Sequence, residues 1–316
     1  MDKTLALKVF KRVSLFLLLL AGSFSVVLLL PFDKQYGYNQ MLKSCDKGNW
    51  IYSRIFLNKT PIDVAFIGTS HTDCGVDDEL LETLIKKQTG DTLHIANFGF
   101  CRFGRTLDYA IIKDMLKYHH PKMIVLEVQN TETRFSHEDF PCIADSRDLI
   151  GAGFYSGYFK QITKGIHFRW RYYLGVSDEF PPYKTSDITQ DNKHRIHDGK
   201  KNLIIKEKTK KEKKKNITKD SKDMKTPYSK YSLSYLKKIA AIAKEENIEM
   251  KFLYMPKVCS NAPNKPAGYE DFSRLGEVWL PPMSIYNTPA YCVDYHHLTK
   301  EGATALTNWL ALQFVQ

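Results

Sequence analysis

Residues 62–71, IDVAFIGTSH, decide the fold that we predict for this chain of 316 residues. Residues 63–67 form a continuous apolar run, which is typical of a strand covered by helices on both faces. Gly68 ends the run and places Ser70 in the loop that follows. Because open parallel sheets bind their ligands outside the carboxyl ends of their strands, Ser70 is a candidate functional residue.

Strand-like and helix-like segments alternate along the rest of the chain. Further strands are expected at 93–97, 123–128 and 250–255, and helices at 77–88, 105–118, 229–247, 269–279 and 300–312. Strands separated by helices of this length predict a parallel sheet with helices on both faces. We therefore expect an α/β fold: a three-layer, doubly wound parallel sheet with an N-terminal transmembrane helix and a large insertion.

The net charge of +11 is concentrated in two segments. Residues 1–12 carry +3 and residues 200–226, with 12 lysines against four acidic residues, carry +8. The rest of the chain is formally neutral, so the folded domain is not expected to bind nucleic acid. We interpret residues 200–226 as a solvated loop; contact with anionic phospholipid or a wall polymer is the alternative.

An uncharged segment, residues 13–30, precedes Pro31. At about 1.5 Å per residue it would extend roughly 27 Å, just enough for the hydrocarbon core of a bilayer. A cleaved signal sequence is the competing interpretation, but no convincing small-x-small cleavage site follows. We favour an uncleaved anchor, with basic residues 1–12 in the cytoplasm and the remainder exported.

The anchor divides the chain into a tail, a membrane span, a connector at 31–61 and a domain at 62–316 with an insertion at 131–228. Within the insertion, residues 151–173 are aromatic and basic without strand periodicity, so they are either a lid facing the substrate or an irregular flank packed on the core. The six cysteines of an exported domain are free to form disulfides, although their spacing does not fix the pairs. The chain has no CxxC, so no structural zinc site is expected.

A second group of reactive residues lies near the C-terminus, in the sequence Asp294-Tyr-His-His297. A serine hydroxyl needs an imidazole base, and the imidazole needs a carboxylate that fixes its tautomer. The three-residue spacing lets Asp294 reach Nδ1 of His297 within one turn, which favours His297 over His296 as the base. We predict a catalytic triad of Ser70, His297 and Asp294, with His71 as a loop or supporting residue.

An acyl-transfer site also needs donors for the oxyanion. The candidates are the backbone N–H of Ser70, the backbone N–H of Gly99 after the second strand, and the amide of Asn130 after the third. Glu127, in the third strand, is interpreted as a carboxylate at the edge of the core, with support of a catalytic residue as the alternative.

These segments resemble those of SGNH/GDSL-type hydrolases, over roughly residues 62–130 and 229–314. The resemblance rests on Gly-Thr-Ser70-His, where the family has Gly-Asp-Ser, on Gly99 in Asn-Phe-Gly, on Asn130 near the asparagine segment, and on the terminal Asp294-x-x-His297. Thr69 replaces the usual aspartate, and residues 127–130 lack the usual Gly-x-Asn-Asp. With its N-terminal anchor, the chain most resembles the membrane-anchored branch, which includes the D-alanyl transfer protein of teichoic-acid modification and alginate O-acetylation proteins.

The resemblance implies an extracytoplasmic serine acyltransferase or esterase that acts on acyl groups, such as O-acetyl, of a cell-envelope glycan or polymer. It also implies a membrane-bound O-acyltransferase as partner, with no cofactor and no metal. One alternative is a catalytically inactive anchored module that binds polymer or scaffolds such an acyltransferase. Another is binding of nucleic acid or a lipid surface by the lysine-rich segment.

Overall fold

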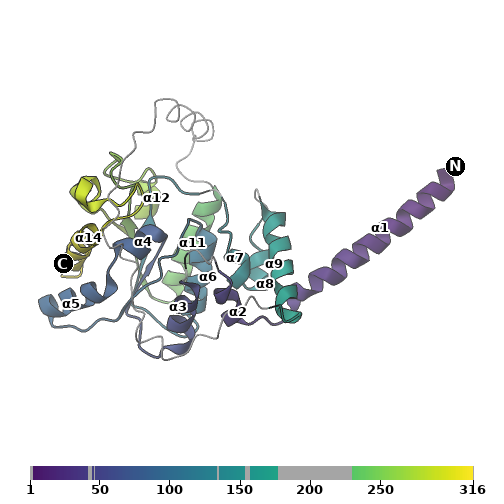
Figure 1. Cartoon of the computed structure of the whole chain (residues 1–316), viewed down its shortest axis with the longest axis horizontal. Coiled ribbons are helices and arrows are strands. Elements are labelled where there is room, and N and C mark those ends of the chain that lie inside the picture. Colours follow the sequence, from purple (N-terminus) through teal and green to yellow (C-terminus); the bar gives the residue numbers. More distant parts are fainter. Residues whose placement is uncertain are drawn as a thin grey trace. The chain divides into compact units, whose positions relative to one another are not determined.

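The computed structural model describes residues 3–41, 45, 47–133, 135–153, 157–176 and 230–315. The chain divides into two compact units (Figure 1). One consists of Met1–Asn49 and Glu138–Pro182, and the other of Trp50–His137 and Tyr183–Gln316. The lysine-rich segment 200–226 lies outside the described residues, so our interpretation of it stays a prediction.

The larger unit is built on a sheet of five parallel strands in the order β2-β1-β3-β4-β5. The strands are β1 (Val64–Ile67), β2 (Ile95–Asn97), β3 (Met123–Val128), β4 (Glu249–Tyr254) and β5 (Glu277–Trp279). The helices of this unit are η2 (Ser53–Leu57, a π-helix), α4 (Ser70–Gly75), α5 (Asp78–Thr89), α6 (Arg105–Met115), α11 (Lys230–Glu245), α12 (Tyr269–Ser273), α13 (Met283–Asn287), η4 (Pro289–Tyr291) and α14 (Lys300–Gln313). The short helix α3 (Gly48–Tyr52) spans the boundary between the units.

Helices cover both faces of the sheet, as the continuous apolar run of β1 predicts. Val64 and Phe66 point to one face and share a core with residues of α5 and α14, including Leu81 and Leu306. Ala65 and Ile67 point the other way and are equally buried, because α6 and α11 pack together on the opposite face (Figure 1). The predicted doubly wound α/β architecture is confirmed.

One predicted helix is wrong. Residues 269–279 were expected to be helical throughout, but only α12 is helical, and β5 then adds a fifth strand to the edge of the sheet. Gly276 explains the change, because a Cβ there would lie 2.3 Å from the Met250 carbonyl oxygen. The missing side chain lets the backbone approach β4, where Lys251 pairs with Glu277.

The strand order locates the region where a ligand would bind. The chain places β2 on one side of β1 and β3 on the other, so the direction of winding reverses between β1 and β3. In sheets of this order the ligand crevice opens outside the carboxyl ends of the strands at that reversal. Ser70 follows β1 at this edge of the sheet, and Gln129 and Asn130 follow β3.

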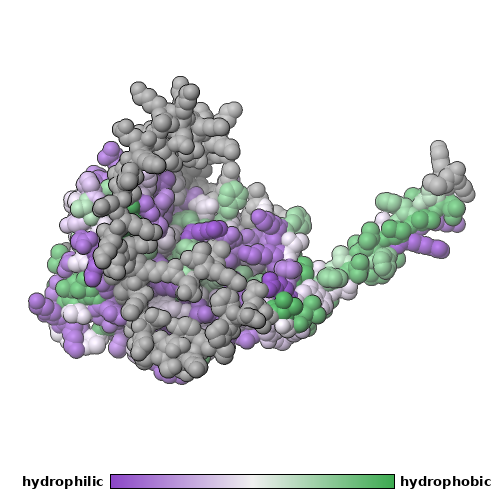
Figure 2. Space-filling model, in the orientation of Figure 1, coloured by the Kyte–Doolittle hydropathy of each residue, from purple (hydrophilic) through white to green (hydrophobic). Residues whose placement is uncertain are grey.

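The smaller unit begins with α1 (Lys3–Ser25) and the 3-10 helix η1 (Val26–Leu29). The segment Thr4–Leu29 is long and apolar enough to cross a membrane, although a signal sequence would also meet this criterion. Its apolar side chains are largely exposed, as the green surface of α1 in Figure 2 shows. The helix starts ten residues before the predicted span at 13–30 and includes part of the basic tail.

The remaining helices of the smaller unit are α2 (Lys34–Asn39), α7 (Phe140–Ile143), α8 (Ser146–Ile150) and α9 (Tyr158–Tyr173). For residues 151–173, the alternative of an irregular flank is wrong, because most of the segment forms α9, and the interpretation as a lid stays a prediction. Phe168 and Tyr172 lie one turn apart on α9 and pack against Phe32, with ring centroids 5.8 and 5.5 Å away. The Trp170 indole donates to the carbonyl oxygen of Phe24 at 3.0 Å. These aromatic residues therefore pack on the end of α1 and on the segment that follows it.

Candidate active site

The segment that carries Ser70 is a tight turn from β1 into α4. Thr69 caps the helix, and its side chain accepts a hydrogen bond from the His71 N–H at 3.1 Å. Gly68 is required by close packing, because a Cβ there would lie 2.3 Å from Thr72 Oγ1 and 2.5 Å from Glu127 Oε2. Ser70 is half-buried at the first residue of α4, where its hydroxyl faces the C-terminal segment.

The candidate base, His297, lies in a turn that Asp294 stabilises by hydrogen bonds. Asp294 Oδ1 accepts hydrogen bonds from the backbone N–H groups of His296 and His297, at 2.6 and 2.8 Å. Its Oδ2 lies 2.8 Å from Nδ1 of His297. A disulfide between Cys259 and Cys292 fastens the chain two residues before Asp294 to the loop after β4. The carboxylate therefore shapes the turn and orients the imidazole at the same time.

The three predicted triad residues form one hydrogen-bonded chain. His297 Nε2 lies 2.9 Å from Ser70 Oγ, although 227 residues separate them in the sequence. A neutral imidazole that donates from Nδ1 to Asp294 has its lone pair on Nε2, directed at the serine hydroxyl. The His297 side chain is 24% exposed and that of Asp294 is 44% exposed, so a substrate can reach the chain.

The electrostatics of the turn keep Asp294 ionised. Burial alone would raise the pKa of its carboxyl, but the hydrogen bonds from the His297 ring and from the backbone of His296 outweigh it. The net pKa is below the ordinary value of an aspartate. An ionised carboxylate behind Nδ1 stabilises the imidazolium that forms when the ring takes a proton.

The predicted oxyanion donors are only partly assembled. The N–H of Ser70 has no hydrogen-bond partner among the described residues. The Gly99 backbone packs against α4, where a Cβ would lie 2.3 Å from the Asp73 nitrogen, but its N–H donates to Asn97 Oδ1 at 2.9 Å. Asn130 is half-buried at the bend beyond β3 and makes no hydrogen bond to the triad within the described part of the chain.

Glu127 has a larger part in the site than the interpretation as a core-edge carboxylate implies. It is 1% exposed and accepts hydrogen bonds from the N–H and hydroxyl groups of both Thr69 and Thr72 and from the Gln129 amide, at 2.6–3.2 Å. Burial would raise its pKa, but the His71 ring and these donors lower it below the ordinary value. The carboxylate thus fixes both sides of Ser70, which is the alternative that the sequence left open. An acidic residue inside the apolar strand MIVLEV is the signal for such a role, because a buried charge needs partners.

Arg105 holds the end of β3 by hydrogen bonds. Its role was not identified from the sequence. The guanidinium is buried and binds both carboxylate oxygens of Glu132, at 2.8 and 2.5 Å. It also donates to the Glu127 carbonyl oxygen at 2.6 Å and to Asp108 at 3.0 Å. Burial raises the pKa of Asp108 to about 6 despite this contact. The network fixes the path of residues 127–132, the segment that carries Gln129 and Asn130.

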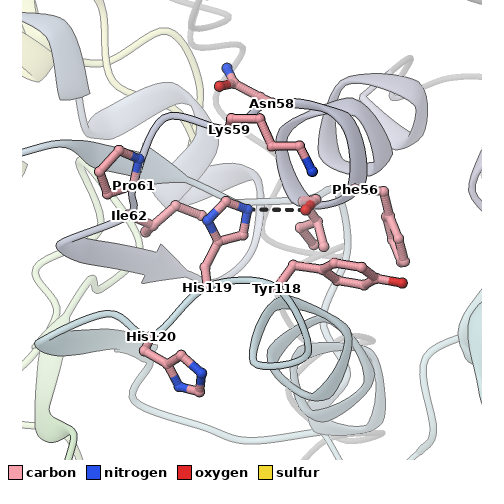
Figure 3. A pocket seen from close by; sticks show the side chains of 9 residues that line it. Phe56, Asn58, Lys59, Pro61, Ile62, Tyr118, His119 and His120 are labelled. Atoms are coloured by element: carbon pink, nitrogen blue, oxygen red, sulfur yellow. Dashed lines mark hydrogen bonds between the residues drawn. The ribbon is translucent and has the colours of Figure 1, made fainter.

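A pocket of about 270 Å³ lies at the opposite end of the strands from Ser70 (Figure 3). Its walls come from η2, from the residues before β1 and from the residues before β3, including Lys59, Tyr118 and His120. His119 closes its base by a 3.0 Å hydrogen bond to the Ile55 carbonyl oxygen. The pocket lies at the amino ends of the strands, so it is separate from the triad. Within the described residues, no group of three or more His, Cys, Asp or Glu side chains is placed to hold a metal ion.

Comparison with known proteins gives little on function. No protein-family profile and no curated protein matches the sequence. Among solved structures, the chain is similar to LAE5, an alpha/beta hydrolase enzyme from the metagenome of Lake Arreo, Spain. The two share 10% identity with a TM-score of 0.40, and the match covers 82% of this chain and 99% of LAE5. So distant a likeness carries no argument about mechanism, and the functional case rests on the geometry of the site.

Proposed function

We propose that the larger unit is a serine esterase or acyltransferase in which Ser70 is the nucleophile, His297 the general base and Asp294 the residue that orients the base. The observation that carries the proposal is the continuous chain from Asp294 Oδ2 through the imidazole to Ser70 Oγ, with contacts of 2.8 and 2.9 Å. Both distances are hydrogen-bond distances, and the 2.9 Å contact is short enough for proton transfer from the nucleophile to its base.

In the proposed reaction, Ser70 Oγ attacks the carbonyl carbon of an ester while its proton passes to His297 Nε2. The tetrahedral intermediate then collapses: the bond to the leaving alkoxide breaks, and Nε2 returns the proton to that oxygen. The acyl group stays on Ser70 as an ester. A water molecule or a sugar hydroxyl then gives its proton to Nε2 and attacks the acyl carbon. The bond from that carbon to Ser70 Oγ breaks, and Nε2 returns the proton to Oγ, which regenerates Ser70.

The intermediate's oxyanion needs donors, and the N–H of Ser70 is the best supported of the three candidates because no described residue accepts from it. The N–H of Gly99 would serve only after release from Asn97 Oδ1, and the Asn130 amide only after moving toward Ser70. Each donor that takes part would stabilise the transition state by about 2.7–4 kcal/mol.

Two observations support an extracytoplasmic substrate. Thr4–Leu29 has the length and apolar composition of a membrane span with a basic N-terminal flank. The Cys259–Cys292 disulfide suits an oxidising compartment outside the cytoplasm. We therefore propose acyl groups, such as O-acetyl, of a cell-envelope glycan or polymer as substrate, and a membrane-bound O-acyltransferase as the donor partner when transfer rather than hydrolysis occurs.

The test is turnover of p-nitrophenyl acetate by the purified protein and by the Ser70→Ala and His297→Ala variants. Each variant is expected to lose at least about 10³-fold in kcat, because the serine and its base act as a unit. The His120→Ala variant, changed at the exposed far edge of the sheet, is the matched control and should keep wild-type turnover. Wild-type rates in Ser70→Ala would overturn the proposal.

A second candidate function is an anchored, non-catalytic module that binds polymer or scaffolds an O-acyltransferase. The observation that favours it is the internal hydrogen bond of Gly99, which leaves the predicted oxyanion hole incomplete. This candidate predicts polymer binding that is unaffected by His297→Ala and no ester turnover. Turnover that depends on His297 would exclude it.

A further inference from the structure

A pair of histidines, His71 and His296, lies directly beside the proposed triad. His71 follows Ser70 on α4 and is 6% exposed. Its Nδ1 lies 3.4 Å from the Met255 carbonyl oxygen, at the end of β4, and its Nε2 lies 3.4 Å from Nδ1 of His296. The ring therefore links three parts of the site: the nucleophile helix, the end of β4 and the Asp294 turn.

The partners of His71 fix where its proton lies. A carbonyl oxygen can only accept, so the nitrogen that faces Met255 must carry the hydrogen. In a neutral ring the other nitrogen is then an acceptor, and the proton between the two histidines belongs to His296 Nδ1. With a neutral His71, the result is one directional chain from His296 to His71 to Met255.

His296 shares its turn with the catalytic base. Its backbone N–H and that of His297 donate to the same oxygen of Asp294, at 2.6 and 2.8 Å. A shift of the His296 ring is therefore transmitted to the carboxylate and through it to His297. We propose that neutral His71 is a positioning residue for the triad, which holds the Asp294–His297 turn against the nucleophile helix through His296. This inference rests on the proposed function of Ser70 and His297.

The charged groups around the pair determine its response to acid. Burial is the largest influence and lowers the pKa of His71; Glu127 and Asp294 oppose it, and His297 adds to it. Burial also lowers the pKa of His296, with help from His71, Lys257 and His297 and against Asp294. Protonation of His71 would turn its Nε2 into a donor, and His296 would then keep the link only by carrying its own hydrogen on Nε2 instead of Nδ1.

The sign of the pH effect follows from these shifts. Because the folded pKa of His71 is below the ordinary value of 6.5, the neutral ring stabilises the fold at pH values above about 6.5. This contribution is lost as the pH falls from there through the lower folded pKa.

The proposal is tested with two substitutions of His71. In His71→Gln, the amide can donate to Met255 and accept from His296 but does not titrate, so we expect at least half of the wild-type kcat at pH 7.5. His71→Phe should lower kcat at least tenfold with KM changed less than threefold. His296→Phe should cost as much, and the double variant no more than either single one, because both break one link.

The control is His120→Gln, which should match the wild type throughout. Full kcat in His71→Phe, or a loss of kcat in His71→Gln as large as that in His71→Phe, would overturn the proposal. A separate readout is NMR of the ¹⁵N-labelled imidazoles. A hydrogen on Nδ1 of His71, with a titration of His296 that changes in His71→Gln, would support the link even in a protein without ester turnover. Absence of ester turnover in the wild-type protein would count against the proposed function but not against the link. A hydrogen on Nε2 of His71 at neutral pH would count against the positioning role.

Discussion

Asp294 combines two tasks in one carboxylate, and each oxygen can be tested. One oxygen holds the turn through two backbone N–H groups, and the other faces Nδ1 of His297. In Asp294→Asn, the amide oxygen can keep the turn while the amide nitrogen faces the ring, so the imidazole is expected to adopt the wrong tautomer. We predict a loss in kcat of about 10³–10⁴-fold with little change in stability.

Steady-state kinetics together with urea unfolding check this prediction. Asp294→Ala should lose both kcat and stability, because the turn also loses its acceptor. Equal unfolding free energies for the two variants, or an Asp294→Asn variant with wild-type kcat, would contradict the two-task assignment.

Glu127 makes no hydrogen bond to Ser70 within the described residues, but its replacement should disturb the position of Ser70 because it binds Thr69 and Thr72 on either side. In Glu127→Gln, the amide would bring hydrogens toward the threonine donors that now point at the carboxylate. We predict a loss of about 2–4 kcal/mol in unfolding free energy and at least a tenfold drop in kcat. Glu270→Gln, on the exposed surface of α12, is the matched control.

The pH dependence of stability gives Glu127 a second test. Its folded pKa is lowered from 4.5, so the carboxylate stabilises the fold above about pH 4.5, and this contribution is lost as the pH falls through the lower folded pKa. Unfolding free energies measured between pH 7 and pH 3 should fall more in the wild type than in Glu127→Gln. Parallel curves would show that the carboxylate is not ionised in the fold.

At the scale of elements, the Cys259–Cys292 disulfide ties the loop after β4 to the turn that carries the base. The bond closes 33 residues of chain, and its loss should cost about 2–4 kcal/mol of unfolding free energy. We predict that the Cys259→Ala/Cys292→Ala variant loses this stability. Because the Asp294 turn is then no longer linked covalently to the loop after β4, the kcat of the variant should also fall.

Thermal unfolding and ester turnover of this double variant check the prediction. Cys74→Ala is a useful comparison, because Cys74 is a buried cysteine outside this disulfide and lies on α4 with Ser70. It should lose packing energy but not the link between the two loops. A double variant with wild-type stability would show that the turn is held without the disulfide.

The elements that the sequence predicted well are those whose apolar pattern is set by the sheet. β3 has the bounds expected from its apolar run, and β1 and α5 differ from expectation by one residue at each end or fewer. β5 was missed because three residues carry no readable periodicity and its pairing depends on the contact of Gly276 with β4. The helix α9 in the aromatic segment 151–173 was not predicted, because the aromatic spacing there serves packing within the smaller unit.

The hydrogen-bonded chain of the proposed triad was predictable because such chemistry leaves a local mark: a serine after a strand, and an aspartate three residues before a histidine. The Glu127 and Arg105 networks were less accessible, since most of their partners lie 22–58 residues away and are brought close by the fold. The link from His71 to His296 spans 225 residues and has no sequence pattern of its own. Sequence thus indicates candidate reactive residues, and tertiary contacts determine what holds them.

At the scale of the whole molecule, α1 should determine where the protein resides. Val27 and Leu28 of η1 are buried in the smaller unit, so a truncation should end at Ser25 and leave η1 intact. We predict that the full chain fractionates with membranes and resists carbonate extraction, whereas the chain without residues 1–25 is soluble. The shortened protein should keep full ester turnover, because all three triad residues lie in the larger unit. A truncated protein that still sediments with membranes would show that another surface binds lipid.

The central claim is that Ser70 is activated by His297. The most direct measurement is the rate of covalent labelling by a fluorophosphonate, with the modified residue mapped by mass spectrometry of the digested protein. We predict a single adduct on Ser70, no adduct in Ser70→Ala, and labelling slowed at least 100-fold in His297→Ala. An adduct that persists in Ser70→Ala, or labelling of Ser70 at the same rate without His297, would contradict the account.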